Sequence, residues 1–497
     1  MHQDNTIHLA AFRPLPRQDD WLICDLDGTL IHTDLLDESF WAACGRSMKT
    51  PFRALHALAT AGRPGLKTCL ADIAPIDPNA LPYNADVLNL LTDWRAAGGR
   101  TALVTAADDG LARRIARHLG LFDAVQGSTP GCNLKGAAKA DYILAQYGPD
   151  VTYAGDSEAD LAVWSRVDGA VTVGATPRLR ARAEGSTGSG NVIHLAPRGA
   201  LPPEPGQGLP PLLRALRPHQ WLKNLLVFLP MLAGHDFSAA TLTLCLLAMA
   251  AFSLVASSVY VLNDLLDLAS DRAHPRKRNR PFASGALSLR TGLFMVPGLL
   301  LAGLGLAALT GPLFLGTVAL YFAATLAYSF RLKRFPIVDI CALAALYAMR
   351  VVAGGAATGI PLSAWLMAFI LFFFFSLAAI KRQAELIDTA AAGKATAPGR
   401  GYRTSDLPLV SSMALAAGYL SVLVMALYVD STTVRDLYAH AEPLWGICAI
   451  LLFWISRIAL ITSRGEMHDD PVVYAARDRT SLACFALILG LFAAGSI

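Results

Sequence analysis

The chain has 497 residues, of which 54% are apolar and only 16% are charged, and its formal net charge is +4. Residues 1–200 carry 19 Lys and Arg against 22 Asp and Glu, whereas residues 201–497 carry 23 against 16 and contain long apolar runs. These numbers exclude intrinsic disorder, a disulfide scaffold and a fibrous repeat. They indicate an ordinary globular domain followed by a basic, mostly apolar one.

The N-terminal residues and the cysteines indicate a cytoplasmic first domain. Residues 1–20 mix charges of both signs and contain no apolar run of seven or more residues, so the sequence predicts no secretory signal. The eight cysteines are scattered singly, without a Cys-x-x-Cys pair or a metal-ligand spacing. We therefore expect reduced, structural thiols.

Residues 1–195 alternate short apolar runs with helical patterns, which predicts a parallel sheet covered by helices. The runs that predict strands are residues 21–25, 100–105, 151–154 and 170–173. Between the first two runs, residues 34–82 have helical periodicity and predict a small helical cap over the carboxyl edge of the sheet. Residues 196–211 are dense in Pro and Gly and predict a linker between two domains.

Two acidic residues follow the first predicted strand. Asp25 and Asp27 are two residues apart and precede a glycine turn, so both carboxylates can point into the cleft above a parallel sheet. One can attack phosphorus to give an aspartyl phosphate while the other gives and then takes a proton. Further candidates follow in chain order: Thr105 at the end of a predicted strand, Lys135 in a Leu-Lys-Gly segment, and Asp156 and Asp160 after another strand.

This set resembles the haloacid-dehalogenase-like hydrolase superfamily over about residues 20–185. The resemblance implies that Asp25 is the nucleophile and Asp27 the general acid and base, and that the fold is a Rossmann-like α/β domain. It implies that Thr105 and Lys135 hold the phosphate. It also implies a Mg²⁺ site formed by Asp25, the backbone carbonyl of Asp27, and Asp156, with Asp160 in support. A catalytically inactive scaffold domain is the alternative.

Beyond the linker, nine apolar segments approach the length needed to cross about 30 Å of hydrocarbon. They span residues 218–234, 239–265, 289–309, 312–330, 336–357, 362–380, 408–429, 442–462 and 480–496. Basic residues gather in the connections after the second, fourth, sixth and eighth segments, whereas the alternate connections contain only Arg435. Because cytoplasmic loops retain Lys and Arg, we predict a multi-pass protein of the cytoplasmic membrane. Its N-terminal domain is expected in the cytoplasm and its C-terminus outside.

The end of the second segment carries a polar cluster. Four residues are expected to share one helix face: Asn263, Asp264, Asp267 and Asp271. Carboxylates crowded at a membrane-helix end favour a divalent metal that bridges a diphosphate. Arg272 and Lys277 in the following basic run supply cations suited to phosphate oxygens. A solvated helix end and a positive-inside loop are the plainer alternatives.

This acidic pattern and basic loop are similar to the UbiA-type prenyltransferase superfamily, membrane enzymes of nine helices that handle polyprenyl substrates. Four further stretches resemble the decaprenyl-phosphate phosphoribosyltransferase branch: residues 216–224, 347–355, 381–386 and 476–479. That branch joins the anomeric carbon of phosphoribosyl pyrophosphate to a polyprenyl phosphate. The expected second domain, residues 212–497, is therefore an all-α membrane transferase.

The resemblance implies that pyrophosphate is displaced by the lipid phosphate. The residues expected to bind the Mg²⁺-diphosphate are Asp264, Asp267, Asp271, Asn263, Arg272 and Lys277. The residues expected to hold the lipid phosphate are Lys223, or Lys381 with Arg382. Lys381 and Arg382 lie where aromatic prenyltransferases of the superfamily carry a second acidic motif, and a cation pair there favours an extra phosphate over a second metal.

The fusion predicts two consecutive steps, because the transfer product keeps a 5-phosphate that a hydrolase can remove. The expected partners are therefore polyprenyl phosphate, phosphoribosyl pyrophosphate and the lipid bilayer. Nucleic acid is not expected, because the basic residues are split among four loops without an aromatic platform. The alternatives are an aromatic polyprenyltransferase of quinone biosynthesis with an attached phosphatase, and a transporter or anchor that tethers the phosphatase.

Overall fold

The computed structural model describes residues 19–496 apart from 48, 75, 130–131, 188–190, 196–208, 275–276, 397–399, 433, 435–437, 439 and 468–469. Most of the predicted linker and Arg435 therefore lie outside the described residues. The chain forms two compact units: the first comprises Met1–Ala215 with Val261–Met295, and the second comprises Leu216–Tyr260 with Val296–Ile497.

The first unit contains a six-stranded sheet in which every neighbouring pair is parallel. Its strands are β1 (Trp21–Cys24), β2 (Arg100–Asp108), β3 (Ala124–Ser128), β4 (Val151–Gly155), β5 (Gly169–Val173) and β6 (Asn191–Leu195). The strand order is β3-β2-β1-β4-β5-β6. Strands β2 and β3 therefore lie on one side of β1, and β4, β5 and β6 follow one another on its other side. A crevice at the carboxyl ends of β1 and β4 is the usual ligand site of such a sheet.

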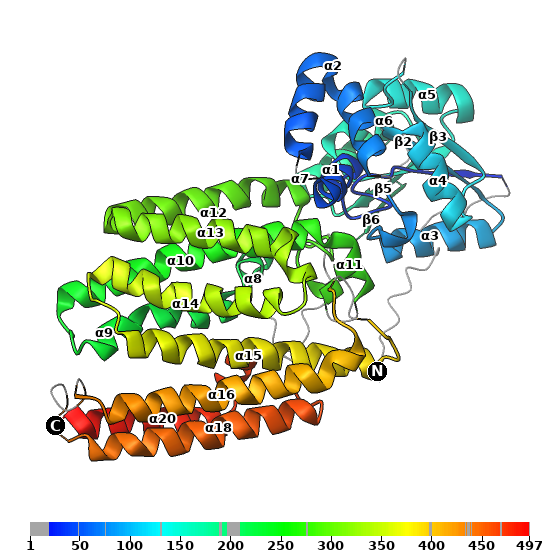
Figure 1. The fold of residues 1–497 in the computed structure, drawn as a ribbon. Coiled ribbons are helices and arrows are strands. Elements are labelled where there is room, and N and C mark those ends of the chain that lie inside the picture. The colour runs from blue at the N-terminus through cyan, green and yellow to red at the C-terminus, as the bar shows by residue number, and fades with distance from the viewer. Residues whose placement is uncertain are drawn as a thin grey trace. The chain divides into compact units, whose positions relative to one another are not determined.

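Helices cover both faces of this sheet (Figure 1). Leu22 and Cys24 pack in a cluster with residues of α3 (Ala85–Ala96) and α4 (Asp109–Leu119). Ile23, between them, packs with residues of helices on the opposite face, because successive side chains of a strand alternate. Those helices are α5 (Ala137–Tyr147), α6 (Leu161–Trp164) and α7 (Pro177–Ser186). The predicted α/β fold with a parallel sheet is confirmed.

The residues predicted to form a cap are largely helical. They contain α1 (Leu35–Arg46), α2 (Thr50–Ile73) and the short 3₁₀ helix η2 (Pro78–Ala80). Helix α2 is interrupted at Gly62, whose φ of 62° and ψ of −161° lie outside the helical range. Ala43 of α1 and Leu70 of α2 belong to a small apolar cluster separate from the clusters of the sheet. The two helices thus have a core of their own.

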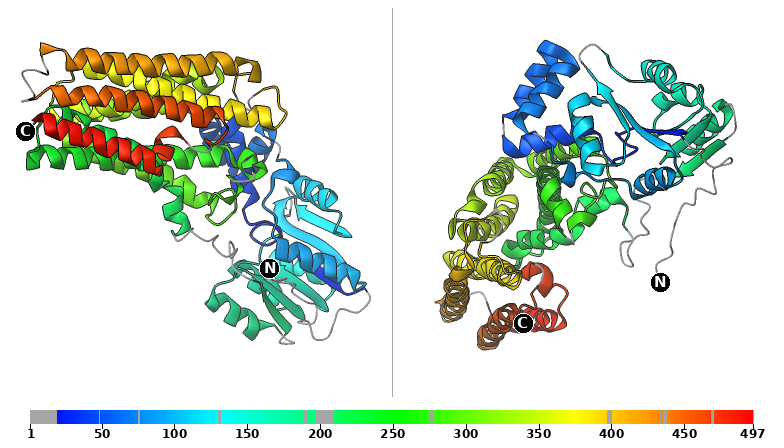
Figure 2. Two further views of the ribbon diagram at one scale, coloured as in Figure 1. Left: turned by 90° about the horizontal axis from the view of Figure 1, so that it is seen from below. Right: turned by 90° about the vertical axis from the view of Figure 1, so that its right-hand side faces the viewer.

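The second unit is helical. Its helices are η4 (Pro218–Phe228), α9 (Leu229–Ala233), α13 (Pro312–Phe330), α14 (Val338–Thr358), α15 (Ala364–Ala391), α16 (Leu407–Val429), α18 (Trp445–Ser463), α19 (Pro471–Ala475) and α20 (Arg479–Ser496). Helices α10 (Ala239–Leu266) and α12 (Leu289–Thr310) lie partly in each unit. Figures 1 and 2 show α13 to α16 side by side, and an apolar cluster joins α14, α15, α16 and α18.

Seven helices in the described part of the chain are long and apolar enough to cross a membrane, so the nine predicted segments are not confirmed. The seven are α10, α12, α13, α14, α15, α16 and α18. The first predicted segment, residues 218–234, is divided between η4 and α9. Pro218 and Pro230 lie at the starts of these two helices, and a proline lacks the amide that a continuous helix requires. The last segment forms α20, which is apolar but short.

Candidate functional sites

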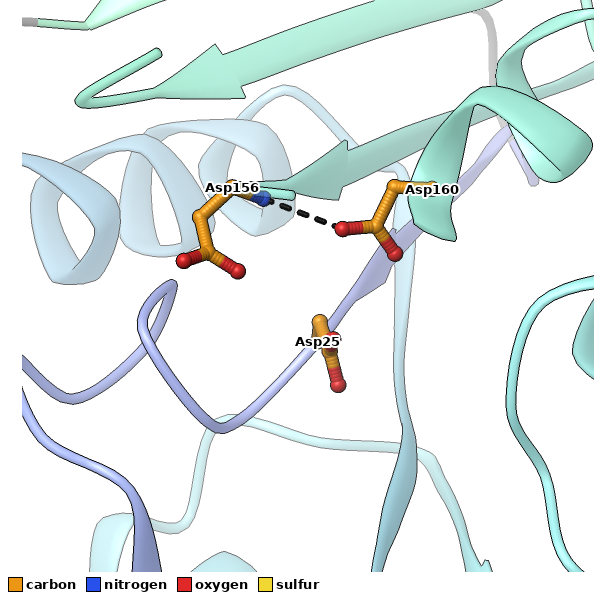
Figure 3. A group of neighbouring side chains, drawn as sticks. All are labelled: Asp25, Asp156 and Asp160. Atoms are coloured by element: carbon orange, nitrogen blue, oxygen red, sulfur yellow. Dashed lines mark hydrogen bonds between the residues drawn. The ribbon is translucent and has the colours of Figure 1, made fainter. Parts of the chain in front are cut away.

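Three of the predicted acidic residues meet at the carboxyl edge of the sheet. Asp25 directly follows β1 and Asp156 directly follows β4, and these strands are neighbours. Asp160 lies in the 3₁₀ turn η3 (Glu158–Asp160). One carboxylate oxygen from each of the three lies within 4.8 Å of the others, and Figure 3 shows Asp25 below the other two. This set of oxygens has the chemistry that suits Mg²⁺.

Asp160 supports the loop that carries Asp156. Its Oδ2 accepts hydrogen bonds from the backbone amides of Asp156 (3.2 Å) and Ser157 (3.0 Å) and from the Ser157 hydroxyl (2.7 Å). Its Oδ1 accepts a hydrogen bond from the Tyr153 hydroxyl at 2.8 Å. A Cβ at position 155 would lie 2.7 Å from the Asp160 carboxyl carbon, so Gly155 is required for this close approach. The geometry agrees with the supporting role expected for Asp160.

The lysine at this site is Lys139, and the prediction of Lys135 is corrected. The Lys139 ammonium lies 2.8 Å from Asp25 Oδ2 and donates to the Tyr153 hydroxyl at 2.9 Å, and its side chain is buried. Lys135 is exposed, before the start of α5 at Ala137. Side chains of a helix tilt toward its N-terminus. A lysine in the first turn of α5 therefore reaches back to the sheet edge.

Asp27 and Thr105 are both placed at this edge. Asp27 Oδ1 accepts a hydrogen bond from the backbone amide of Leu35 at 2.8 Å. Burial, with the Asp34 carboxylate as a second cause, raises the pKa of Asp27 to about 8. The carboxyl group is then protonated at neutral pH and can donate a proton. Thr105 is fully buried within β2, which continues to Asp108 beyond the predicted strand end.

The acidic cluster at the end of α10 spans the junction of two helices. Asp264 lies in the last turn of α10, but the helix ends at Leu266, and α11 (Leu268–Ala273) carries Asp271. Backbone hydrogen bonds from Asp267 to Asn263 and from Asp271 to Asp267 keep the four-residue spacing across this junction. Within the described residues, these acids do not form a convergent metal-ligand group. Arg280 instead donates to Asp264 at 3.2 Å and to Asp271 at 2.6 Å.

Arg272 and Lys277, the two cations predicted to bind the diphosphate, have other surroundings than Arg280. In the first unit, Arg272 donates to both carboxylate oxygens of Glu38 (2.7 and 3.1 Å) and to the backbone carbonyls of Ala80 and Ala283. Lys277 is exposed in η5 (Lys277–Asn279). Arg280 belongs to the same basic run, but the sequence does not indicate which of its cations folds back onto the acids.

In the second unit, Lys223 and Lys381 converge on an acid that the sequence analysis missed. Lys223 Nζ lies 2.8 Å and Lys381 Nζ 2.9 Å from the same Asp470 oxygen, Oδ2. The Tyr347 hydroxyl donates to the other oxygen at 3.1 Å. Arg382 does not join them, because it is fully buried and pairs with Asp339 and Glu385. Of the three cations predicted to hold the lipid phosphate, the structure thus brings two together.

An apolar cavity of about 750 Å³ lies in the second unit. Its lining includes Leu226 of η4, Phe369 and Phe374 of α15, and Phe492 of α20. The ring of Phe374 stacks on Tyr347, with 4.9 Å between the ring centroids and 8° between the planes. Since Tyr347 also donates to Asp470, the charged cluster lies behind one wall of this cavity.

Comparisons with known proteins match both parts of the chain. Residues 225–466 match the UbiA prenyltransferase family, and residues 22–164 match haloacid dehalogenase-like hydrolases. Protein y4nM of Sinorhizobium fredii is 38% identical over 95% of this chain and 90% of its own length. Nodulation protein NoeC of Azorhizobium caulinodans is 40% identical over 56% of this chain and 91% of its own length. Decaprenyl-phosphate phosphoribosyltransferase of Mycolicibacterium smegmatis is 32% identical over 57% of this chain and 91% of its own length.

The position of the lysine gives a testable prediction. Lys139→Ala is expected to lower kcat for hydrolysis of p-nitrophenyl phosphate by about 10²-fold or more, because it removes the buried cation beside the reacting carboxylate. Lys135→Ala is the matched control and is expected to retain activity close to that of the unaltered protein. Steady-state kinetics with Mg²⁺ present checks both. A loss with Lys135→Ala and none with Lys139→Ala would reverse the assignment.

Proposed function

Because the chain belongs to the UbiA prenyltransferase family and carries a haloacid dehalogenase-like hydrolase domain, we propose two consecutive reactions at the membrane. The first transfers 5-phosphoribose from phosphoribosyl pyrophosphate to a polyprenyl phosphate and releases pyrophosphate. The second removes the 5-phosphate from the lipid product. The chain is an enzyme and a multi-pass membrane protein. A cytoplasmic N-terminal domain and an external C-terminus remain predictions.

The observation that carries the proposed acceptor is the convergence of Lys223 and Lys381 on Asp470, which Tyr347 links to Phe374 in the wall of the apolar cavity. A polyprenyl phosphate has an apolar chain and a phosphate head with a charge of about −1.5 to −2 at neutral pH. The cavity would take part of the apolar chain, and the two ammonium groups would hold the phosphate. The relative named decaprenyl-phosphate phosphoribosyltransferase supports this acceptor over an aromatic one.

The proposed donor site lies at the end of α10. Asp264, Asp267 and Asp271 would hold Mg²⁺ on the diphosphate of phosphoribosyl pyrophosphate, and Asn263 would position it. Arg280 pairs with two of these acids, Asp264 and Asp271, in the structure. The lipid phosphate would attack the anomeric carbon as the bond to pyrophosphate breaks. An ionised phosphate oxygen needs no general base for this attack.

The proposed hydrolysis uses the carboxylates at the sheet edge. Asp25 would attack the phosphorus of the 5-phosphate and form an aspartyl phosphate, while Thr105 and Lys139 hold the phosphate oxygens. Protonated Asp27 would donate its proton to the departing ribose oxygen and then accept one from the attacking water. Asp25, Asp156 and the Asp27 carbonyl would hold a Mg²⁺ ion, which when bound supplies positive charge beside the phosphoryl group.

The Asp25→Asn variant tests the two-step proposal. Purified protein is incubated with Mg²⁺, a polyprenyl phosphate and ribose-labelled phosphoribosyl pyrophosphate, and the lipid extract is resolved by mass. The unaltered protein is expected to give labelled lipid without the 5-phosphate, and Asp25→Asn labelled lipid that retains it. Loss of the 5-phosphate at an unchanged rate in Asp25→Asn would contradict the second step. Turnover of an allylic diphosphate with a hydroxybenzoate in its place would select an aromatic prenyltransferase.

The donor site is tested separately by Asp264→Asn. This change is expected to lower the transfer rate by about 10²-fold or more, because it removes a charged ligand of the diphosphate-bound metal. Hydrolysis of p-nitrophenyl phosphate by the same preparation should be retained, which shows that the chain is folded. Glu466→Gln removes an exposed acid of the second unit and serves as the control. Full transfer activity in Asp264→Asn would exclude the proposed donor site.

A further inference from the structure

Asp470 is held at both of its carboxylate oxygens. It lies directly before α19, and its Oδ1 accepts hydrogen bonds from the Val472 amide (3.2 Å) and the Tyr347 hydroxyl (3.1 Å). Its Oδ2 lies between the ammonium groups of Lys223 from η4 and Lys381 from α15. The Asp470 side chain is only 7% exposed. The carboxylate is therefore a fixed, buried point on which two cations from distant parts of the sequence meet.

Two ammonium groups so close to one carboxylate oxygen also lie close to each other and repel in a partly desolvated site. The shared carboxylate offsets this repulsion. Each ammonium carries three N–H donors, of which the structure assigns one to Asp470. The remaining donors allow both lysines to bind the oxygens of one further anion. Lys223 is 9% exposed and Lys381 is 31% exposed, so an anion can approach from the Lys381 side.

The charges around Asp470 favour an anion of charge −2. Arg350 is buried, lies over the Tyr347 ring at 5.5 Å, and donates to Asn224 and Tyr321. Lys223 and Lys381 pair with the Asp470 carboxylate, and the buried Arg350 beside the Tyr347 ring adds a third positive charge to the group, which leaves an excess of two positive charges. The neighbouring cluster of Arg382, Arg400, Asp339 and Glu385 balances itself. A phosphate monoester at neutral pH carries nearly the complementary charge.

We propose that Asp470 is a positioning residue of the acceptor site, which holds the Lys223 and Lys381 ammonium groups side by side so that both bind the phosphate of the lipid acceptor. Asp470 does not itself touch the reacting atoms. This inference rests on the proposed function, since it names a residue that prepares the acceptor site of that reaction.

Kinetics of the full chain in detergent tests this role. Asp470→Asn is expected to raise KM for polyprenyl phosphate by about tenfold or more, because the lysines lose the carboxylate that holds them together. KM for phosphoribosyl pyrophosphate should stay within about twofold. Asp470→Glu keeps the charge but moves it by one methylene, and should restore part of the affinity. Equal changes in both KM values, or no change in either, would overturn the proposal.

Asp478→Asn is the matched control. Asp478 also pairs with a cation, Arg457, and accepts a hydrogen bond from the Ser481 amide near the start of α20, but it contacts neither lysine. If Asp470 only stabilised the fold, Asp470→Asn would behave like Asp478→Asn and would not raise KM selectively for the lipid. If Asp470→Asn does not fold, Lys381→Met provides the same test, because it removes the partly exposed cation and keeps the acid. It should also raise KM selectively for the lipid, and an unchanged KM would contradict the proposal.

Binding measurements separate failure of this proposal from failure of the proposed function. The unaltered protein should bind farnesyl phosphate more tightly than farnesol in isothermal titration calorimetry, and Asp470→Asn should lose this preference. If no transfer from phosphoribosyl pyrophosphate occurs but this preference is present and depends on Asp470, the proposed function fails and the positioning role stands. If transfer occurs and Asp470→Asn keeps the preference for farnesyl phosphate, the positioning role fails alone.

Discussion

A charged group removed from water must find a partner of opposite charge, and this constraint organises both candidate sites. At the sheet edge, the buried Lys139 lies against Asp25, which it would help to react with a phosphate. In the helical unit, Asp470 lies between Lys223 and Lys381. Removing one partner from such a group leaves an uncompensated buried charge, which is strongly destabilising. The pairs that keep these charges inside the protein also set the positions of the groups that meet substrate.

The sequence predicted the features that depend on local pattern. Alternating apolar runs indicated β1, β2, β4 and β5, and the acids that follow β1 and β4 meet because parallel neighbours end at one edge. The sequence analysis named Lys135, whereas the structure places Lys139 beside Asp25, because the lysine that reaches the sheet edge depends on where α5 begins. One residue is exposed before the helix, and the other lies in its first turn, directed back toward the sheet.

Features that depend on contacts distant in sequence were not predictable from one chain. Asp470 is 247 residues from Lys223, and no local pattern relates them. The same holds for Arg382 of α15, which forms an ion pair with Asp339 of α14. The helix that carries Asp264 ends at Leu266, yet Asp264 and Asp271 still lie on one side of the junction, since one Arg280 nitrogen donates to both. Prolines also divide residues 218–234 between η4 and α9, which a hydropathy pattern alone does not reveal.

The chemistry of the proposed product links the two domains. Transfer releases pyrophosphate and leaves a phosphomonoester on the ribose, which is the bond type that a protonated acid beside a nucleophilic carboxylate can cleave. Hydrolysis of that ester removes the transfer product and draws the first reaction forward. A free phosphatase would have to find the same lipid in the membrane, whereas a fused one is always near it.

The time course of lipid labelling under single-turnover conditions tests this account most directly. Ribose-labelled phosphoribosyl pyrophosphate is mixed with excess protein, Mg²⁺ and a polyprenyl phosphate, and the lipid fraction is sampled and resolved by mass. The account predicts that label appears first in lipid that carries the 5-phosphate and passes, after a lag, into lipid that lacks it. Absence of label from the lipid, or appearance of the dephosphorylated product without a lag and without its precursor, would contradict it.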